Sequence, residues 1–246
     1  MNNETVNSIQ DVIEENKKLM DYSISIVIPT LNEENGIAYV LNEINEELKA
    51  YNFEALVVDG RSTDDTINIS RKMGAKILLE NEKGYGVAIK NGIMNAKADV
   101  ICVIDGDGTY PVNAIPSMLK TLNKDEDVFI TTNRFAYIDK RSMGPVHKLG
   151  NMILTFTMNI LFRSNLKDSQ SGMWLFKTSI RKSIMPEADD MSFSQEIKIR
   201  ALQKYRVIEM PIEYRKRIGE VKLNTFRDGV NNLISLFKLK IRLSKL

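Results

Sequence analysis

Cysteine and histidine, the residues of disulfides and of many metal sites, are scarce in this sequence. It contains one cysteine and one histidine in 246 residues. A single cysteine cannot form a disulfide within the chain. Cys102 lies in an apolar segment, so we expect an inert packing residue in a reducing compartment. His147 alone cannot build a histidine-rich metal site or an active site that needs two histidines, and we expect it to be a loop or interface residue.

The chain also lacks a long uncharged apolar segment and a strong excess of either charge. No apolar run reaches the ~20 residues of a membrane-spanning helix. The first 20 residues carry acidic side chains and no apolar core, which predicts a polar N-terminal extension over 1–20 and not a signal peptide. The formal net charge of +2 is small for a general nucleic-acid-binding protein. We therefore expect a soluble or peripheral protein on the cytoplasmic side of the membrane, without a nucleic-acid partner.

Strand-like and helix-like segments alternate through the first half of the chain. Short runs rich in β-branched residues are followed by segments with helical periodicity. The predicted strands cover 23–29, 53–59, 75–79, 100–104 and 127–132, and the predicted helices cover 35–49, 62–73, 84–98 and 111–122. This alternation is typical of an α/β fold with a doubly wound, mostly parallel sheet and right-handed crossovers.

The segment at 100–104 runs directly into two acidic residues, Asp105 and Asp107. So short an apolar run predicts a strand that is buried on both faces. Its carboxyl end is where open α/β sheets bind their ligands. Carboxylates two residues apart on an extended chain point the same way and can share one divalent cation. A polar turn after a core strand is the alternative interpretation.

Further acidic residues follow two earlier strands, with Glu33 after the first and Asp59 at the end of the second. The carboxyl ends of a doubly wound sheet meet at one crevice, so we predict an acidic pocket. Such a pocket suits a divalent cation that carries a diphosphate, with acceptors for ribose and base. No Gly-x-Gly-x-x-Gly follows the first strand and no P-loop lysine motif is present, which disfavours dinucleotide and P-loop proteins.

Several segments, in this order, resemble motifs of the family 2 inverting glycosyltransferases, which have the GT-A fold. The segments are IVIPTLNEE at 26–34, VVDGRSTDDT at 57–66, KGYG at 83–86 and DGD at 105–107. Three later segments resemble the dolichyl-phosphate mannose/glucose synthase branch: DSQSG at 168–172, SQE at 194–196 and IEYRKRIGE at 212–220. The resemblance implies a GT-A domain over 21–220, with a nucleotide-sugar half at 21–135 and an acceptor half at 136–220.

The resemblance also implies roles for individual residues. The nucleotide-sugar-binding positions are Pro29, Glu33, Asp59, Lys83, Asp105 and Asp107. Asp105 and Asp107 would hold Mg²⁺ or Mn²⁺, with Thr109 as a further candidate ligand. The acceptor-binding positions are Arg134, Ser171, Arg215 and Arg217. The catalytic positions are Asp107, Arg134 and Glu196, of which Glu196 would orient the acceptor or the sugar.

The implied reaction moves a hexose, with inversion, from GDP-mannose, UDP-glucose or UDP-GlcNAc to a polyprenyl (dolichyl) phosphate. The product would serve glycan or glycoprotein assembly. A phosphate monoester has a second pKa of ~6 and is ionised at neutral pH, so no strong general base is needed. A hydroxyl acceptor, on a lipid-linked sugar or a polysaccharide, would need Asp168 or Glu196 as the base. The sequence also leaves open a nucleotidyltransferase and a non-catalytic membrane scaffold.

Two segments have apolar stripes with basic neighbours. Residues 149–162 carry no charge, and as a helix these 14 residues would extend ~21 Å, less than the ~30 Å hydrocarbon core. Residues 221–246 include six basic residues and one acidic residue on a helical repeat. We predict that both are amphipathic helices at the membrane interface, the second a basic C-terminal helix. Burial in the core or in the interface of a homo-oligomer is the alternative.

Overall fold

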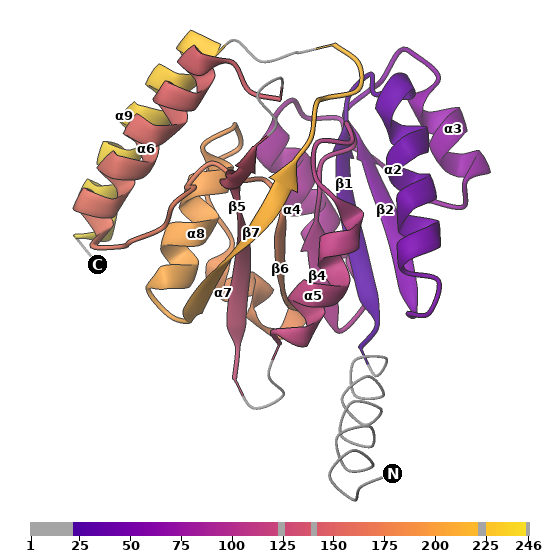
Figure 1. The fold of residues 1–246 in the computed structure, drawn as a ribbon, viewed down its shortest axis with the longest axis horizontal. Helices are drawn as coiled ribbons and strands as arrows, with labels where there is room; N and C mark the ends of the chain where they lie inside the picture. Colours follow the sequence, from indigo (N-terminus) through magenta and orange to yellow (C-terminus); the bar gives the residue numbers. More distant parts are fainter. Residues whose placement is uncertain (1–21, 123–125, 139–141, 221–224, 245–246) are drawn as a thin grey trace, which may run out of the picture.

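A computed structural model describes residues 22–122, 126–138, 142–220 and 225–244. The predicted extension at 1–20 and the ends of the 221–246 segment lie outside the described residues. The described part forms a seven-stranded sheet between helices (Figure 1). The strands are β1 (Ile24–Thr30), β2 (Phe53–Asp59), β3 (Lys76–Leu79), β4 (Val100–Val103), β5 (Val128–Ile138), β6 (Trp174–Lys177) and β7 (Arg206–Tyr214).

The sheet has the order β3-β2-β1-β4-β6-β5-β7. β6 is antiparallel to both of its neighbours, and the other described pairs are parallel. The predicted mostly parallel α/β sheet is therefore confirmed. β6 and β7 were not among the predicted strands, and the strand predicted at 127–132 continues to Ile138 through an irregularity between Asn133 and Tyr137.

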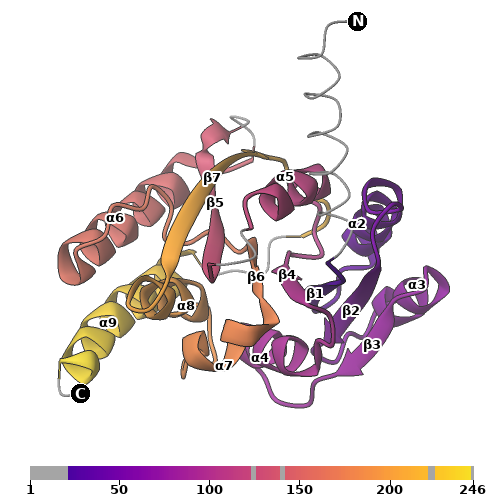
Figure 2. The same ribbon diagram turned by 90° about the horizontal axis from the view of Figure 1, so that it is seen from below.

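The helices cover both faces of the sheet (Figure 2). They are α2 (Glu34–Glu47), α3 (Thr66–Lys72), α4 (Tyr85–Asn95), α5 (Ile115–Lys120), α6 (Pro145–Phe162), α7 (Arg181–Ile184), α8 (Phe193–Leu202) and α9 (Thr225–Leu243). The helix predicted at 111–122 is a 3-10 turn followed by α5. Pro116 lies in the first turn of α5, where its missing N–H has no helical acceptor to lose.

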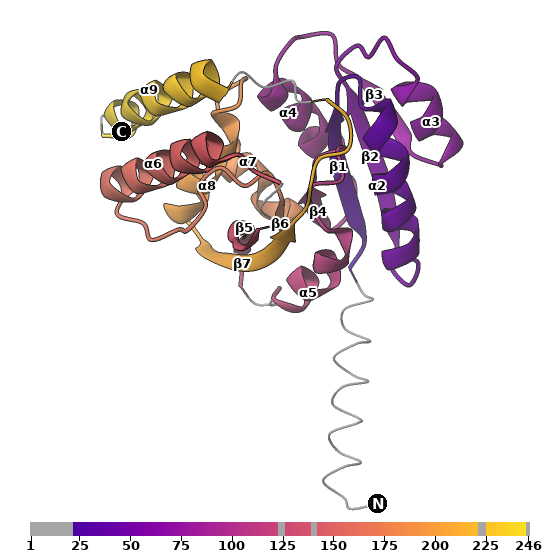
Figure 3. The ribbon, with the colours of Figure 1, turned by 45° about the horizontal axis from the view of Figure 1, so that its top comes forward.

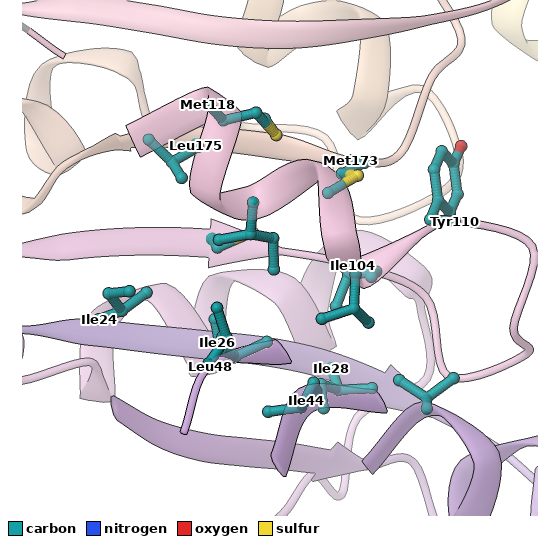
Figure 4. Close-up of a cluster of buried hydrophobic side chains, with 14 of the residues drawn as sticks. Ile24, Ile26, Ile28, Ile44, Leu48, Ile104, Tyr110, Met118, Met173 and Leu175 are labelled. Carbon is teal, nitrogen blue, oxygen red and sulfur yellow. The ribbon is translucent and has the colours of Figure 1, made fainter. Parts of the chain in front are cut away.

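Two apolar layers follow from the alternation of side chains along the strands. Ile24, Ile26 and Ile28 of β1 face α2 and α5, where they meet Ile44 and Leu48 (Figure 4). The intervening Val27 faces α4 and α8 on the other side of the sheet. Cys102 is buried in the same layer as Ile24, Ile26 and Ile28, as expected, and burial raises the pKa of its thiol to about 12.

α6 and α9 lie side by side at the edge of the molecule beyond β5 and β7 (Figures 1 and 3). Leu154 and Met158 of α6 pack against Leu236 and Leu239 of α9, together with Ile199 of α8. The opposite faces of both helices are apolar and exposed. Their exposed residues are Val146, Leu149, Met152, Ile153, Phe156, Ile160, Phe226, Val230, Ile234, Phe237 and Ile241.

The side chain of Phe156 is 67% exposed and that of Ile160 is 62% exposed. The alternative in which the 149–162 segment is buried in the core is therefore wrong. The helix also begins earlier than predicted, at Pro145, a residue that suits the first helical position. Among the described residues, no helix combines the length and the apolar character needed to cross a membrane.

The close approach of α4 to the sheet gives a testable prediction. A Cβ on Gly92 would lie 2.3 Å from Cγ1 of Val27 and 2.9 Å from Cγ2 of Val58. We expect Gly92→Ala to lower the free energy of unfolding by about 1–3 kcal/mol because the packed valines must move. The matched control is Gly150→Ala in α6, where nothing lies within 4 Å of the new Cβ. This variant should gain about 0.5–1 kcal/mol.

Urea denaturation of both variants measures the two effects. Equal changes in the free energy of unfolding would show that Gly92 has no special packing role.

Candidate active site

The loops that follow the parallel strands meet at one edge of the sheet, as the sequence predicts. Glu33 follows β1 and Asp107 follows β4, and the guanidinium group of Arg217 donates hydrogen bonds to both carboxylates. The backbone of the same segment is also bound there: Ile218 N–H donates to the carbonyl of Asp107 at 2.9 Å. The chain beyond β7 therefore lies across the predicted acidic pocket.

Asp105 and Asp107 form the centre of this pocket. The hydroxyl of Tyr85, at the start of α4, donates to Oδ1 of Asp105 at 3.1 Å. Burial, together with the negative charge of Asp107, raises the pKa of Asp105 to about 7. Asp107 is held by Thr109, whose N–H and Oγ1 donate to its Oδ1 at 3.0 and 2.7 Å. The two carboxylates thus repel each other in a buried setting.

This pair fits a hard divalent cation such as Mg²⁺ or Mn²⁺, which prefers oxygen ligands. A cation would relieve the repulsion that raises the pKa of Asp105. The described residues contain no cluster of three or more Asp, Glu, His or Cys side chains for a metal. Magnesium at nucleotide sites is often bound by one or two carboxylates and substrate phosphates, so two are sufficient there. Thr109 bonds to Asp107 and so positions that carboxylate.

The other predicted nucleotide-sugar residues lie in two places. Asp59, at the end of β2, is fully buried and accepts hydrogen bonds from Ser62 N–H at 2.8 Å, from the Ser62 hydroxyl and from the Thr30 hydroxyl. Pro29 lies beside it in β1, opposite Val58 of β2. Lys83 lines a cavity of about 400 Å³ between the start of α4, residues 188–192 and α9. The hydrogen bonds that Asp59 accepts from Ser62 fix the loop after β2.

A buried ion pair forms the other side of the site. Arg134, within β5, donates from Nε and Nη2 to the two oxygens of Asp168 at 2.7 and 2.9 Å. Its guanidinium carbon lies 5.3 Å from the ring centre of Tyr214. Burial would raise the pKa of Asp168, but the charge and hydrogen bonds of Arg134 outweigh burial and hold that pKa below its usual range. Asp168 thus fixes the planar guanidinium group.

Residues 168–172 connect this ion pair to the carboxylates. The Ser171 hydroxyl lies 2.6 Å from that of Thr132, and Gly172 N–H donates to the Tyr110 hydroxyl at 2.6 Å. A Cβ on Gly172 would lie 3.2 Å from Oδ2 of Asp105. The segment that carries Asp168 therefore reaches the centre of the acidic pocket, and a side chain at position 172 would crowd it.

Three predicted site residues lie away from the positions expected for them. Arg217, expected on the acceptor side, bonds to the donor-side carboxylates Glu33 and Asp107. Arg215 donates to Glu43 of α2 at 2.7 Å. Glu196 accepts hydrogen bonds from the N–H groups of residues 187 and 188 and from Arg200 and Arg242. In this position Glu196 supports the loop before α8.

Two tyrosines at the site were not among the predicted residues. Tyr85 bonds to Asp105, and Tyr110 accepts the N–H of Gly172. Both lie inside or directly after a motif, since Tyr85 belongs to KGYG and Tyr110 follows DGDGT. The sequence therefore contained a signal for them: an aromatic hydroxyl next to a loop that was already assigned to the site.

Comparisons with known proteins agree on one family. Residues 25–185 match Glycosyl transferase family 2. The dolichyl-phosphate hexose transferase of Haloferax volcanii is 31% identical over 207 residues, which cover 84% of this chain and 89% of that protein. The low-salt glycan biosynthesis hexosyltransferase Agl6 of the same organism is 32% identical over 213 residues, 84% of this chain and 51% of Agl6. The dolichol-phosphate mannosyltransferase of Pyrococcus furiosus is 26% identical over 210 residues, 81% of this chain and 59% of that protein.

A solved structure confirms the predicted GT-A type of fold. Glucosyl-3-phosphoglycerate synthase from Mycobacterium tuberculosis, in complex with Mn²⁺, UDP and glucosyl-3-phosphoglycerate, superposes with a TM-score of 0.74. The superposition covers 93% of this chain and 83% of that one at 19% sequence identity. A likeness at this identity establishes the fold alone.

The raised pKa of Asp105 gives a prediction for metal binding. Below about pH 7 a metal ion must displace the proton of Asp105, so Mn²⁺ affinity should fall, by up to about tenfold per pH unit. Above that pH the affinity should level off. The loss of the free Mn²⁺ signal in electron paramagnetic resonance measures binding from about pH 5.5 to about pH 8.5.

The Asp105→Asn variant should bind Mn²⁺ weakly and without this pH dependence. Glu46→Gln, on the exposed face of α2, is the matched control and should behave as wild type. A flat pH profile in the wild type would contradict the raised pKa of Asp105. Unchanged binding by Asp105→Asn would rule out Asp105 as a metal ligand.

Proposed function

The chain belongs to glycosyl transferase family 2 and is a glycosyltransferase, and we propose that it transfers a hexose from a nucleotide sugar to a polyprenyl phosphate with inversion. One observation carries the proposal: a carboxylate pair, half-buried Asp105 and buried Asp107, is joined by residues 168–172 to the buried Arg134–Asp168 pair. The carboxylate pair, which can bind a cation, and Arg134, which can bind an anion, thus lie on adjacent sides of one site. The product is a lipid-phosphate-linked sugar for glycan or glycoprotein assembly.

The donor side is built from the strand ends. Asp105 and Asp107 hold the metal, which when bound neutralises the charge that develops on the leaving diphosphate. Glu33 and Pro29 belong to the nucleoside side, where the fully buried Asp59 acts through the loop that it fixes after β2, and Lys83 lies just before α4. Arg217, which pairs with Glu33 and Asp107, has a planar guanidinium group that can grip a phosphate instead. The donor is GDP-mannose, UDP-glucose or UDP-GlcNAc.

The acceptor side favours a phosphate as the attacking group. Arg134 is fixed by Asp168, and its positive charge acts on Asp105 of the carboxylate pair. A hydroxyl acceptor would need a general base, but the two candidates are occupied. Asp168 has a lowered pKa and binds Arg134, which makes it a weak base. Glu196 is held by two N–H groups and two arginines.

The acceptor's lipid tail implies contact with a membrane, and α6 and α9 offer a surface for it. Their exposed apolar faces lie on one side of the molecule, where basic side chains accompany them. The exposed basic residues are Lys148, Arg163, Arg227, Lys238 and Lys240. Apolar burial combined with attraction to anionic headgroups is how interfacial helices bind. We therefore infer a peripheral protein on the cytoplasmic face of a membrane.

A transfer assay tests the proposed reaction. The full chain is incubated with radiolabelled GDP- and UDP-sugars, dolichyl phosphate and Mg²⁺ or Mn²⁺, and label that enters the organic phase is counted. One donor should give a lipid-linked product that disappears with chelator. Asp107→Asn should lower the rate by about 100-fold or more because it weakens the grip on the leaving diphosphate. Glu46→Gln should keep the wild-type rate.

A parallel reaction with a lipid-linked sugar as acceptor tests the hydroxyl-acceptor reaction. Transfer to its hydroxyl group and none to dolichyl phosphate would replace the proposed acceptor. Full activity in chelator would refute the metal-dependent mechanism.

The membrane surface has its own test. Replacing Phe156 and Ile160 by Asp puts two charges on the exposed face of α6 and should weaken binding to vesicles that contain anionic lipid by about tenfold or more. Transfer to a short, water-soluble prenyl phosphate should persist because the site is untouched. The matched control replaces Leu79 and Met94 by Asp, two exposed apolar residues on β3 and α4. Co-sedimentation with vesicles measures binding.

Equal loss of binding in the control, or no binding by the wild type, would contradict the membrane surface. A stable dimer of the wild type that becomes a monomer in the Phe156/Ile160 variant would assign this face to a homo-oligomer instead.

A further inference from the structure

A buried ammonium group lies directly behind residues 168–172. Lys198, on α8, has no exposed surface. Its Nζ donates hydrogen bonds to the carbonyl oxygens of Ser169 at 2.9 Å, Ser171 at 2.6 Å and Ser194 at 3.0 Å. A charged lysine has three N–H donors, and these three acceptors use all of them.

The burial of this charge is unfavourable in itself. Desolvation lowers the pKa of Lys198 to about 7, and Arg134 acts in the same direction, while the charges of Asp168 and Glu209 oppose the shift. The acceptors that touch Nζ are backbone carbonyls, which solvate a cation less well than water does. An apolar side chain would avoid the cost of burying a charge, but it would remove the donor that Lys198 provides to the buried carbonyls of Ser169 and Ser171. The ammonium group therefore acts on the backbone of this segment and does more than fill space.

The carbonyls that Lys198 binds belong to the segment that joins the two sides of the site. From this segment, Asp168 holds Arg134, the Ser171 hydroxyl contacts Thr132, and Gly172 lies against Asp105. Lys198 thus binds the backbone of residues 169–171, and the neighbouring side chains and backbone of this segment make the contacts that fix the site.

We propose that Lys198 is a positioning residue for the transfer reaction, whose charged amino group anchors residues 169–171 so that Asp168 can orient Arg134 and Gly172 can lie against Asp105. The inference rests on the proposed function. A neutral lysine has two donors and one lone pair, so one of the three carbonyls would face a lone pair. The full anchor therefore requires the charged form.

The chain's only tryptophan reports on this anchor without any substrate. Trp174 is fully buried, and its Nε1 donates to the carbonyl of Ser171 at 2.7 Å, the same oxygen that Lys198 binds. The Nζ atom of Lys198 lies 5.2 Å from the ring centre of Trp174. Loss of the charge, or movement of the Ser171 carbonyl, should change the tryptophan emission.

The first measurement is the emission of Trp174 from about pH 5.5 to about pH 8.5. The wild type should show a transition near pH 7. Asp105 titrates in the same range, so Asp105→Asn is measured too and should keep the transition. Lys198→Met, of similar length and without donors, should abolish it. Lys204→Met, an exposed lysine just beyond α8, should leave it unchanged.

The second measurement is steady-state kinetics with dolichyl phosphate. Lys198→Met should lower kcat by about 10- to 100-fold, because a small displacement of the catalytic groups is costly. The KM of the nucleotide sugar should stay within about threefold, since the donor side is held by other contacts. Lys204→Met should match the wild type.

A Lys198→Met protein with wild-type kcat and an unchanged emission transition would show that Lys198 only fills space. If this variant does not fold, Lys198→Arg is measured in its place. The guanidinium group of this variant is always charged, so the pH transition of the Trp174 emission should disappear and activity should persist at alkaline pH. Persistence of the transition in Lys198→Arg would overturn the proposal. Absence of transfer by the wild type would refute the proposed function, whereas the emission test would still decide whether the anchor exists.

Discussion

Two carboxylates follow β4, half-buried Asp105 and buried Asp107, and the cost of keeping both charged is the constraint on which the rest of the site depends. Desolvation, together with the negative charge of Asp107, raises the pKa of Asp105 to about 7. Tyr85 donates to one carboxylate and Thr109 to the other, while Arg217 supplies positive charge from the far end of the chain. Arg217 thus occupies the place at the strand end where, under the proposed function, a cation and a diphosphate would bind.

On the side of the site that contains Arg134, two of the three buried charges are positive. Arg134 is neutralised by Asp168, and Lys198 is satisfied by three carbonyl groups behind the same segment. Charges of alternating sign therefore run through the interior from Asp105 to Arg134, Asp168 and Lys198. A buried network of this kind is rigid when every member is satisfied. Under the proposed function, this rigidity would help to align two phosphate-bearing substrates.

β6 is the element that brings these two halves together. It pairs antiparallel with β4 and with β5, so the segment before it, 168–172, arrives at the same edge of the sheet as the ends of the parallel strands. Without this reversal, Asp168 and Gly172 would lie at the opposite edge. Helices α6 and α9 lie beyond β5 and β7, on the side of the sheet where β5 carries Arg134 (Figure 1). Under the proposed function, a lipid-borne phosphate would approach from that side.

The alternating first half of the fold and the acidic pocket could be predicted from the amino-acid sequence. Both follow from local patterns: apolar runs of β-branched residues specify strands, and parallel strands must end at a common edge. The family motifs and the amphipathic character of α6 and α9 were likewise visible in the spacing of residues. The partner of each charged side chain, in contrast, depends on the folded chain. Arg217 lies 110 residues from Asp107 and 184 from Glu33, and Lys198 binds carbonyls 27 and 29 residues away. No local pattern encodes such pairings, because they depend on how β6 and β7 insert into the sheet, and β6, with only four residues, is too short to show a clear periodicity.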